Sequence, residues 1–138
     1  MTIIAGGAGI TPFLQLVRGV MRDPADKTEV RLVYAVNKSE DLVGKEEFDD
    51  LEKTSGGRFK RVYVVGGTSG AEEAQHDEGV VRGRINRSVV ETAMGTKAEW
   101  GNTKVLICGP DGLVEAVAGK KSGILKELGV PQGQVHKF

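Results

Sequence analysis

Apolar and polar positions divide the chain into short apolar runs and longer segments with helical spacing. The first run, residues 2–5, stops at the glycine cluster of residues 6–9, and apolar side chains then recur at helical spacing from Phe13. We expect Thr11 to cap this helix and Pro12 to occupy its first position, because the fixed φ of proline suits a helix start. The chain therefore opens as a strand, a glycine turn and a helix.

The alternation of strands and helices continues to the end of the chain. Apolar, β-branched runs predict further strands at residues 29–36, 59–65, 104–108 and 134–138. Residues 66–82 lack periodicity and are expected to form a loop. Helical spacing predicts helices at residues 42–53, after a cap at Asn86, after Gly112 and at residues 123–128. Five strands joined by helices predict an α/β fold: a doubly wound, five-stranded parallel sheet in the order 3-2-1-4-5, with helices on both faces.

Two glycine turns follow the first and fourth predicted strands, at residues 6–11 and 109–112. In the predicted order both turns lie where the strand order reverses, which is where doubly wound sheets bind ligands. Glycines allow close approach to a ligand, and unpaired N–H groups at a helix start attract phosphate. Each turn alone is also explained by a tight bend, and Pro12 stands where a G-x-G-x-x-G fingerprint has its third glycine. Two such turns at one switch point favour a bound dinucleotide.

Composition limits the classes of function. A length of 138 residues fits one domain, and the 19 basic and 19 acidic residues cancel without forming blocks, which argues against nucleic-acid binding. Cys108 is the only cysteine, so a reducing, intracellular compartment is expected. No apolar stretch approaches the roughly 20 residues of a membrane segment, and Met1 directly before the first strand suggests a fragment. His76 and His136 are expected at the surface, without the spacing of a metal site.

The two turns carry motifs that resemble those of a known family. Gly6-Gly7-Ala8-Gly9-Ile10-Thr11-Pro12 and Cys108-Gly109-Pro110-Asp111-Gly112 are similar to the two glycine motifs of the NAD(P)-binding domain of the ferredoxin-NADP reductase superfamily. The resemblance is closest to the cytochrome b5 reductase and nitrate reductase branch and covers the whole chain. Residues 123–138 resemble fungal mitochondrial-type members. Gly83-Arg84-Ile85 stands where the branch has Gly, an aromatic residue and an apolar residue.

The resemblance implies that residues 1–138 form an NAD(H)-binding domain whose flavin-binding domain is absent. The family passes a hydride from NADH to FAD, which delivers electrons to a haem protein such as cytochrome b5. FAD is therefore expected in an upstream flavin domain and not in this chain. Cys108 is implied to lie beside the nicotinamide as the catalytic residue. The implied cofactor-binding residues are Gly6, Gly7, Ala8, Gly9, Thr11, Pro12, Asp41, Cys108, Gly109, Pro110 and Asp111.

Three of these positions leave a question open. Asp41 matches the acidic residue that favours NADH, because a carboxylate accepts hydrogen bonds from a ribose diol and repels the 2′-phosphate of NADPH. A surface acid after a strand is equally explained as a helix cap. Cys108 is also typical of a small buried residue at a strand end. Ala8 replaces the usual Thr of the motif, which removes a hydroxyl that lies near the flavin in the family.

The sequence therefore predicts the NADH-binding part of a flavin-dependent oxidoreductase. We expect it to be mitochondrial or cytoplasmic, with any membrane anchor in a missing N-terminal region. The alternative is a stand-alone nucleotide-binding or interaction module without redox turnover. A flavodoxin-like FMN carrier fits less well, because its phosphate loop is normally rich in Ser and Thr, whereas residues 6–9 contain neither.

Overall fold

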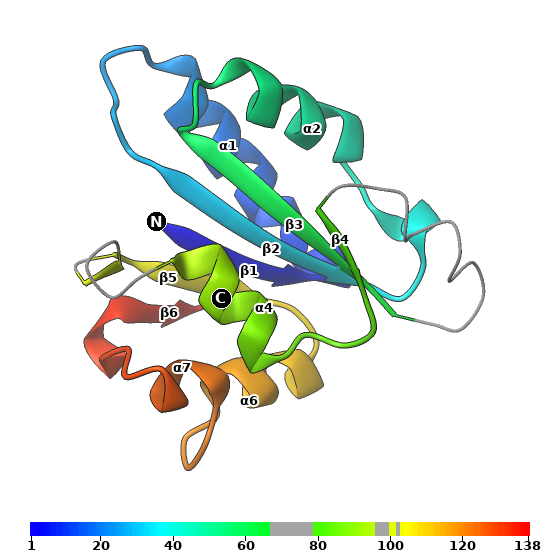
Figure 1. Ribbon diagram of the computed structural model, residues 1–138, viewed down its shortest axis with the longest axis vertical. Helices are drawn as coiled ribbons and strands as arrows, with labels where there is room; N and C mark the ends of the chain where they lie inside the picture. The colour runs from blue at the N-terminus through cyan, green and yellow to red at the C-terminus, as the bar shows by residue number, and fades with distance from the viewer. Residues whose placement is uncertain (67–78, 96–99, 102) are drawn as a thin grey trace.

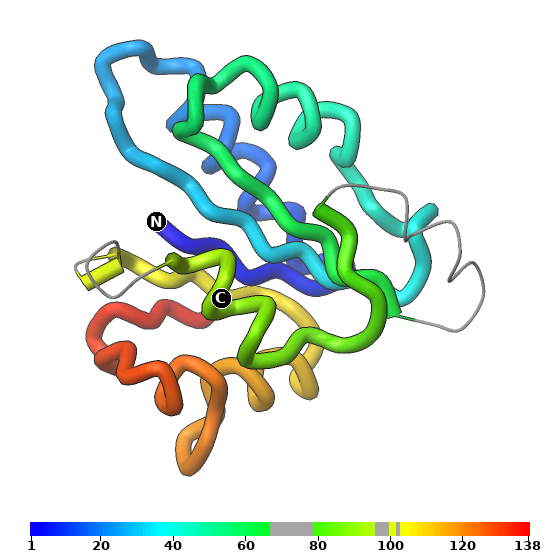
Figure 2. Tube along the Cα trace, in the orientation of Figure 1, coloured from blue at the N-terminus to red at the C-terminus, as the bar shows by residue number. Residues whose placement is uncertain are grey.

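The fold is seen in a computed structural model that describes residues 1–66, 79–95, 100–101 and 103–138. Within these residues one parallel sheet has six strands in the order β4-β3-β2-β1-β5-β6. β1 pairs with β2 on one side and with β5 on the other, so the first strand lies inside the sheet (Figure 2). The strands are β1 (Thr2–Gly6), β2 (Val30–Val36), β3 (Phe59–Val65), β4 (Val80–Arg82), β5 (Val105–Cys108) and β6 (Val135–Lys137).

Helices lie on both faces of the sheet (Figure 1). One face is covered by α1 (Thr11–Arg22) and α2 (Lys45–Thr54), and the other by α4 (Arg87–Met94), α6 (Asp111–Ala118) and α7 (Ile124–Glu127). Successive strand residues point to opposite faces, and both faces are buried. Along β2, Leu32 and Tyr34 pack in the same core cluster as Phe48 of α2, whereas Val33 between them packs in the cluster of Val90 of α4. This double burial explains the apolar strand sequences.

The predicted class and the order of the five predicted strands are confirmed, but the predicted number of strands was wrong. Val80–Arg82, placed by the sequence pattern in the loop of residues 66–82, forms β4 beside β3. The Tyr63 N–H donates to the Gly79 carbonyl at 2.7 Å, and the Gly83 N–H donates to the Val65 carbonyl at 2.9 Å. Three residues in a glycine-rich segment are too few to give a periodic signal. Their strand conformation depends on pairing with β3.

The start of α1 also differs from the prediction. A 3-10 turn, η1 (Gly7–Ile10), leads directly into α1, so Thr11 is the first residue of the helix and Ile10 is its cap. The Thr11 hydroxyl donates to the Ala8 carbonyl at 3.0 Å and therefore does not cap the helix. Pro12 lies in the first turn, one position later than predicted. The 3-10 turn extends the helical backbone towards the glycines, which explains the shift.

The starts of α4 and α2 were also predicted from the sequence. The Asn86 side chain accepts a hydrogen bond from the Val89 N–H at 2.9 Å, which confirms the predicted cap of α4. The helix predicted at residues 42–53 begins three residues later, at Lys45, because Gly44 before it has a left-handed φ of 80°. A short 3-10 turn, η2 (Ser39–Asp41), precedes it. Asp41 therefore lies in the connection between β2 and α2.

The turn after β1 packs directly on the turn after β5. A Cβ at Gly9 would collide with the backbone carbonyl of Cys108. A Cβ at Gly109 would lie 3.1 Å from the Gly6 nitrogen, and one at Gly6 would lie 3.2 Å from Cδ of Pro110. Close contact between the two turns therefore requires these three glycines, whereas Gly7 is required by its positive φ of 52°.

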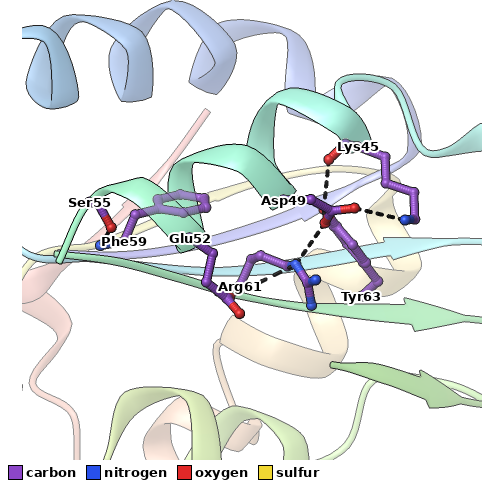
Figure 3. A network of polar contacts seen from close by, with 7 residues as sticks. All are labelled: Lys45, Asp49, Glu52, Ser55, Phe59, Arg61 and Tyr63. Atoms are coloured by element: carbon purple, nitrogen blue, oxygen red, sulfur yellow. Dashed lines mark hydrogen bonds and ion pairs between the residues drawn. The ribbon is translucent and has the colours of Figure 1, made fainter. Parts of the chain in front are cut away.

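A polar network joins α2 to β3 (Figure 3). The Asp49 carboxylate accepts hydrogen bonds from the Tyr63 hydroxyl at 2.6 Å, from Arg61 Nε at 2.9 Å and from Lys45 Nζ at 2.8 Å. Burial opposes the charge of Asp49, but the hydrogen bonds from Lys45 and Tyr63 and the charge of Arg61 outweigh it, so its pKa is lowered from 3.8. Burial and the bond to Asp49 raise the pKa of the Tyr63 hydroxyl, which stays a donor. The network fixes α2, and with it the connection that carries Asp41.

The contact between the turns predicts opposite effects for two Gly to Ala substitutions. Gly9→Ala should lower the free energy of unfolding by about 2 kcal/mol or more, because the Cys108 carbonyl is backbone and cannot move aside easily. Gly19→Ala, at an exposed site in α1 with no atom near the added Cβ, should raise it by about 0.5–1 kcal/mol. Urea denaturation measures both. A Gly9→Ala protein as stable as the wild type would contradict the contact.

The network predicts a pH-dependent stability. Asp49→Asn should lower the free energy of unfolding by about 1–3 kcal/mol at neutral pH, because charged hydrogen bonds to three partners are lost. The pKa of Asp49 in the folded state is lowered from 3.8, so this contribution is present above that value and is lost as the pH falls through the folded pKa. The difference in the free energy of unfolding between wild type and variant should thus shrink as the pH falls below about 4.

Asp50→Asn is the matched control, because Asp50 is the exposed neighbour of Asp49 on the same helix. Denaturation curves of the three proteins at several pH values measure the effect. An equal loss of stability in both variants, or a loss independent of pH, would exclude the ionised network as its cause.

Candidate functional site

A cleft of about 410 Å³ opens at the carboxyl ends of β1, β2 and β3. Both glycine turns contribute to it, with Gly6 and Gly7 from the first turn and Pro110 and Gly112 from the second. A Cβ at Gly7 or at Gly112 would meet no atom within 4 Å, so the backbone at these positions is open to an incoming molecule. The cleft lies at the point where the strand order reverses, between β1 and β5, which is where the sequence predicted the meeting of the two turns.

The start of α1 adds a feature that suits an anion. Among the described residues, no side chain caps either η1 or α1, so the first N–H groups of this turn are not bound by a side chain. Such groups carry partial positive charge. Together with the open backbone at Gly7, they fit the diphosphate of a dinucleotide.

A second cleft, of about 500 Å³, lies between α4 and strands β2 to β4. Arg31 and Lys60 line it, near the amino ends of their strands. Thr92 of α4 and Asn86, the cap of that helix, also contribute to the cleft. It contains neither glycine turn. Open α/β sheets bind dinucleotides at the carboxyl ends of their strands, and this is where the smaller cleft opens.

The structure brings most of the predicted site residues together. Gly6, Gly7 and Pro110 line the cleft, and Gly9, Cys108 and Gly109 form the contact between its two turns. The other predicted site residues of this region are exposed at or next to the two turns: Ala8, Thr11, Pro12 and Asp111. Asp111 is also the first residue of α6, where a carboxylate stabilises the helix dipole. Only Asp41 lies away from the turns, beyond the end of β2 and outside the residues that line the cleft.

The backbone around Asp41 is held by a buried tyrosine. The Tyr34 hydroxyl accepts a hydrogen bond from the Val43 N–H at 3.0 Å and donates to the Asp41 carbonyl at 3.4 Å. The Val43 N–H also lies 2.9 Å from that carbonyl, and the Asp41 N–H donates to the Lys38 carbonyl at 2.9 Å. Tyr34 is fully buried, and its burial raises the pKa of its hydroxyl. The Asp41 backbone is therefore fixed, while its side chain is exposed to solvent.

Cys108 is the last residue of β5 and pairs with Ala5 of β1. It is partly buried, and it packs against the core cluster that contains Phe13 of α1. Its free thiol therefore lies at the junction of the two turns. Packing positions the Cys108 side chain in either case, whether it borders a nicotinamide or is only a small buried residue at a strand end.

Sequence reasoning missed part of the cleft. Asn37, Gly66 and Arg84 contribute to its lining from the ends of β2, β3 and β4. Arg84 could not be recognised from periodicity, because it lies between the three-residue β4 and the cap of α4. Its position depends on the unpredicted strand.

The described residues contain no group of three or more His, Cys, Asp or Glu side chains that could hold a metal ion. His136 is exposed on β6, and His76 lies outside the described residues. In the part of the chain that the structure describes, no helix has the length and apolar character needed to cross a membrane.

Comparisons with known proteins agree with this geometry. Residues 3–119 match the profile of the family described as the oxidoreductase NAD-binding domain. The chain is 39% identical to NADH-cytochrome b5 reductase 2 of Botryotinia fuckeliana and 40% identical to that of Aspergillus oryzae. Both alignments cover 100% of this chain but only 40% and 43% of the relatives.

A solved structure gives the same result. The cytochrome b5 reductase domain of Ulva prolifera nitrate reductase matches with a TM-score of 0.79 at 28% identity, over 99% of this chain and 47% of that chain. The fold, the paired glycine turns and these matches lead to one conclusion: the chain belongs to the oxidoreductase NAD-binding domain family, and it is similar over its whole length to part of the NADH-cytochrome b5 reductases.

Proposed function

We propose that this chain binds NADH in the cleft of the two glycine turns and presents the nicotinamide to FAD in a flavin domain outside residues 1–138. The observation that carries the proposal is the contact of the Gly6–Gly9 turn with the Cys108–Gly112 turn beside an open cleft. Hydride transfer requires the two rings to lie within reacting distance, and the role of the protein is to place them. The chain spans less than half the length of the relatives, which leaves room for a flavin domain in the full protein.

Within this proposal the two turns have different tasks. The first turn, with Gly6, Gly7, Ala8, Gly9, Thr11 and Pro12, binds the pyrophosphate and the nicotinamide half. The second turn, from Cys108 to Asp111, borders the nicotinamide, and the Cys108 thiol shapes the geometry of hydride transfer. The position of Cys108 at the junction of the turns supports this assignment.

Asp41 is proposed to select NADH over NADPH. Its turn follows β2, and Tyr34 holds the backbone of this turn, so the exposed carboxylate starts from a fixed backbone near the carboxyl edge of the sheet. A carboxylate there accepts hydrogen bonds from a ribose diol and repels a 2′-phosphate.

FAD is proposed to pass the electrons to cytochrome b5 or another haem protein. The names of the relatives, NADH-cytochrome b5 reductase 2, support this acceptor. They favour the reductase over a stand-alone nucleotide-binding module. An intracellular location, mitochondrial or cytoplasmic, stays a prediction.

Titration of the chain with NADH and with NADPH tests binding and selectivity together. We expect weak binding, with NADH preferred, because part of the nicotinamide's surroundings comes from the flavin domain. Asp41→Thr should narrow the difference in Kd between the two nucleotides by about threefold to tenfold, because a charge repulsion of about 1 kcal/mol is removed. Calorimetry measures both constants.

Glu40→Thr is the control, because Glu40 is the neighbouring exposed acid in the same turn. It should leave the preference unchanged. If the preference for NADH is unchanged in Asp41→Thr, the carboxylate has only a structural role in its turn. A wild-type chain that does not respond to millimolar NADH would refute NADH as the cofactor.

Fusion to the flavin domain of one of the fungal relatives tests the redox role. The isolated chain should not reduce ferricyanide with NADH, whereas the flavin-loaded fusion should. Cys108→Ser in the fusion should lower kcat more than it raises the Kd for NADH, since the thiol is proposed to act on geometry at the nicotinamide. Stopped-flow measurement of flavin reduction separates the two. A flavin-loaded fusion without activity would favour the stand-alone module.

A further inference from the structure

The charge of the cleft is concentrated in one side chain. Among the described residues that line it, Arg84 alone is charged, and the others are glycine, proline, asparagine or apolar residues. A dinucleotide carries two negative charges on its diphosphate, and the glycine turns offer only neutral N–H groups. The cleft therefore has one full positive charge available for a strongly anionic ligand.

The backbone at Arg84 is fixed on both sides. Before it, the Gly83 N–H donates to the Val65 carbonyl at 2.9 Å, which continues the pairing of β4 with β3. After it, Asn86 caps α4 through the Val89 N–H. The base of the Arg84 side chain is thus anchored at the edge of the cleft by the sheet and by the helix.

The side chain of Arg84 is exposed and uncommitted. Within the described part of the chain it has neither a hydrogen bond nor an ion pair, whereas Arg82 donates to the Gly66 carbonyl at 3.4 Å. Arg87, three residues further, lies 3.8 Å from a Glu91 oxygen and 4.0 Å from a Glu127 oxygen. Arg84 therefore has a guanidinium free to bind a ligand, and Arg87 does not line the cleft.

We propose that Arg84 binds a phosphate group of the dinucleotide. This inference rests on the proposed function, because it requires the dinucleotide to occupy the cleft. A guanidinium offers paired N–H donors that match two phosphate oxygens, and its charge adds to the neutral donors of the first turn. The phosphate is either the diphosphate shared by all pyridine dinucleotides or the 2′-phosphate of NADPH. Both have the same chemistry at the guanidinium.

Calorimetric titration with NADH and NADPH tests the contact in the wild type, Arg84→Gln and Arg87→Gln. Arg84→Gln should raise Kd by about threefold to tenfold, a moderate effect because the site is open to solvent. It should also weaken the dependence of Kd on salt, because an ionic contact is removed. Arg84→Lys should keep part of the affinity, and Arg87→Gln, the matched control outside the cleft, should stay within about twofold of the wild type.

The change in Kd for NADH compared with that for NADPH shows which phosphate Arg84 contacts. Equal losses for NADH and NADPH in Arg84→Gln support a contact with the diphosphate, and a loss confined to NADPH supports a contact with the 2′-phosphate. Wild-type affinity and salt dependence in Arg84→Gln for both nucleotides, or an equal loss in Arg87→Gln, would overturn the inference. A wild-type chain that binds neither nucleotide overturns the proposed function, and with it this contact.

Discussion

The close contact of Gly9 with the Cys108 carbonyl is the constraint on which the candidate site depends. It joins the turns after β1 and β5, which pair in the sheet although about a hundred residues separate them along the chain. Because Gly9 lies directly against the backbone of Cys108, the cleft beside the two turns has a fixed shape. Glycine is required here by packing as much as by conformation, because only Gly7 among these positions has a positive φ. A site built on backbone contact between parallel strands is as rigid as the sheet itself.

The connection that carries Asp41, the residue proposed to select the nucleotide, is also fixed by the fold. Tyr34 and Tyr63 are directly opposite each other on β2 and β3, and their rings lie edge to face with centroids 6.3 Å apart. The Tyr34 hydroxyl binds the backbone at residues 41 and 43. The Tyr63 hydroxyl binds the side chain of Asp49, which follows in α2. Two neighbouring buried residues of the sheet therefore hold the chain on either side of the start of α2, including the backbone of Asp41. This arrangement ties the proposed nucleotide selection to the core.

Elements with a long or purely local sequence signal could be predicted, whereas short elements held by distant contacts could not. Long apolar strands and the Asn86 cap were predictable because local chemistry determines them. The convergence of the two turns was predictable because strand order and the rules for parallel sheets place them together. β4 was missed because three residues gain their conformation from β3, and Thr11 was misassigned because the 3-10 turn before it depends on the packing of Gly9. Arg84 and the Asp49 network were missed because each depends on contacts between elements distant in sequence.

The central proposal is a dinucleotide bound in the cleft beside the two turns, at the carboxyl edge of the sheet. The most direct test is a crystal structure of this chain with NAD⁺ bound. We predict electron density for the diphosphate against the Gly6–Gly9 turn, with the nicotinamide towards Cys108 and the second turn. Density for NAD⁺ in the larger cleft beside Arg31 and Lys60, with the cleft of the glycine turns empty at saturating NAD⁺, would contradict the account.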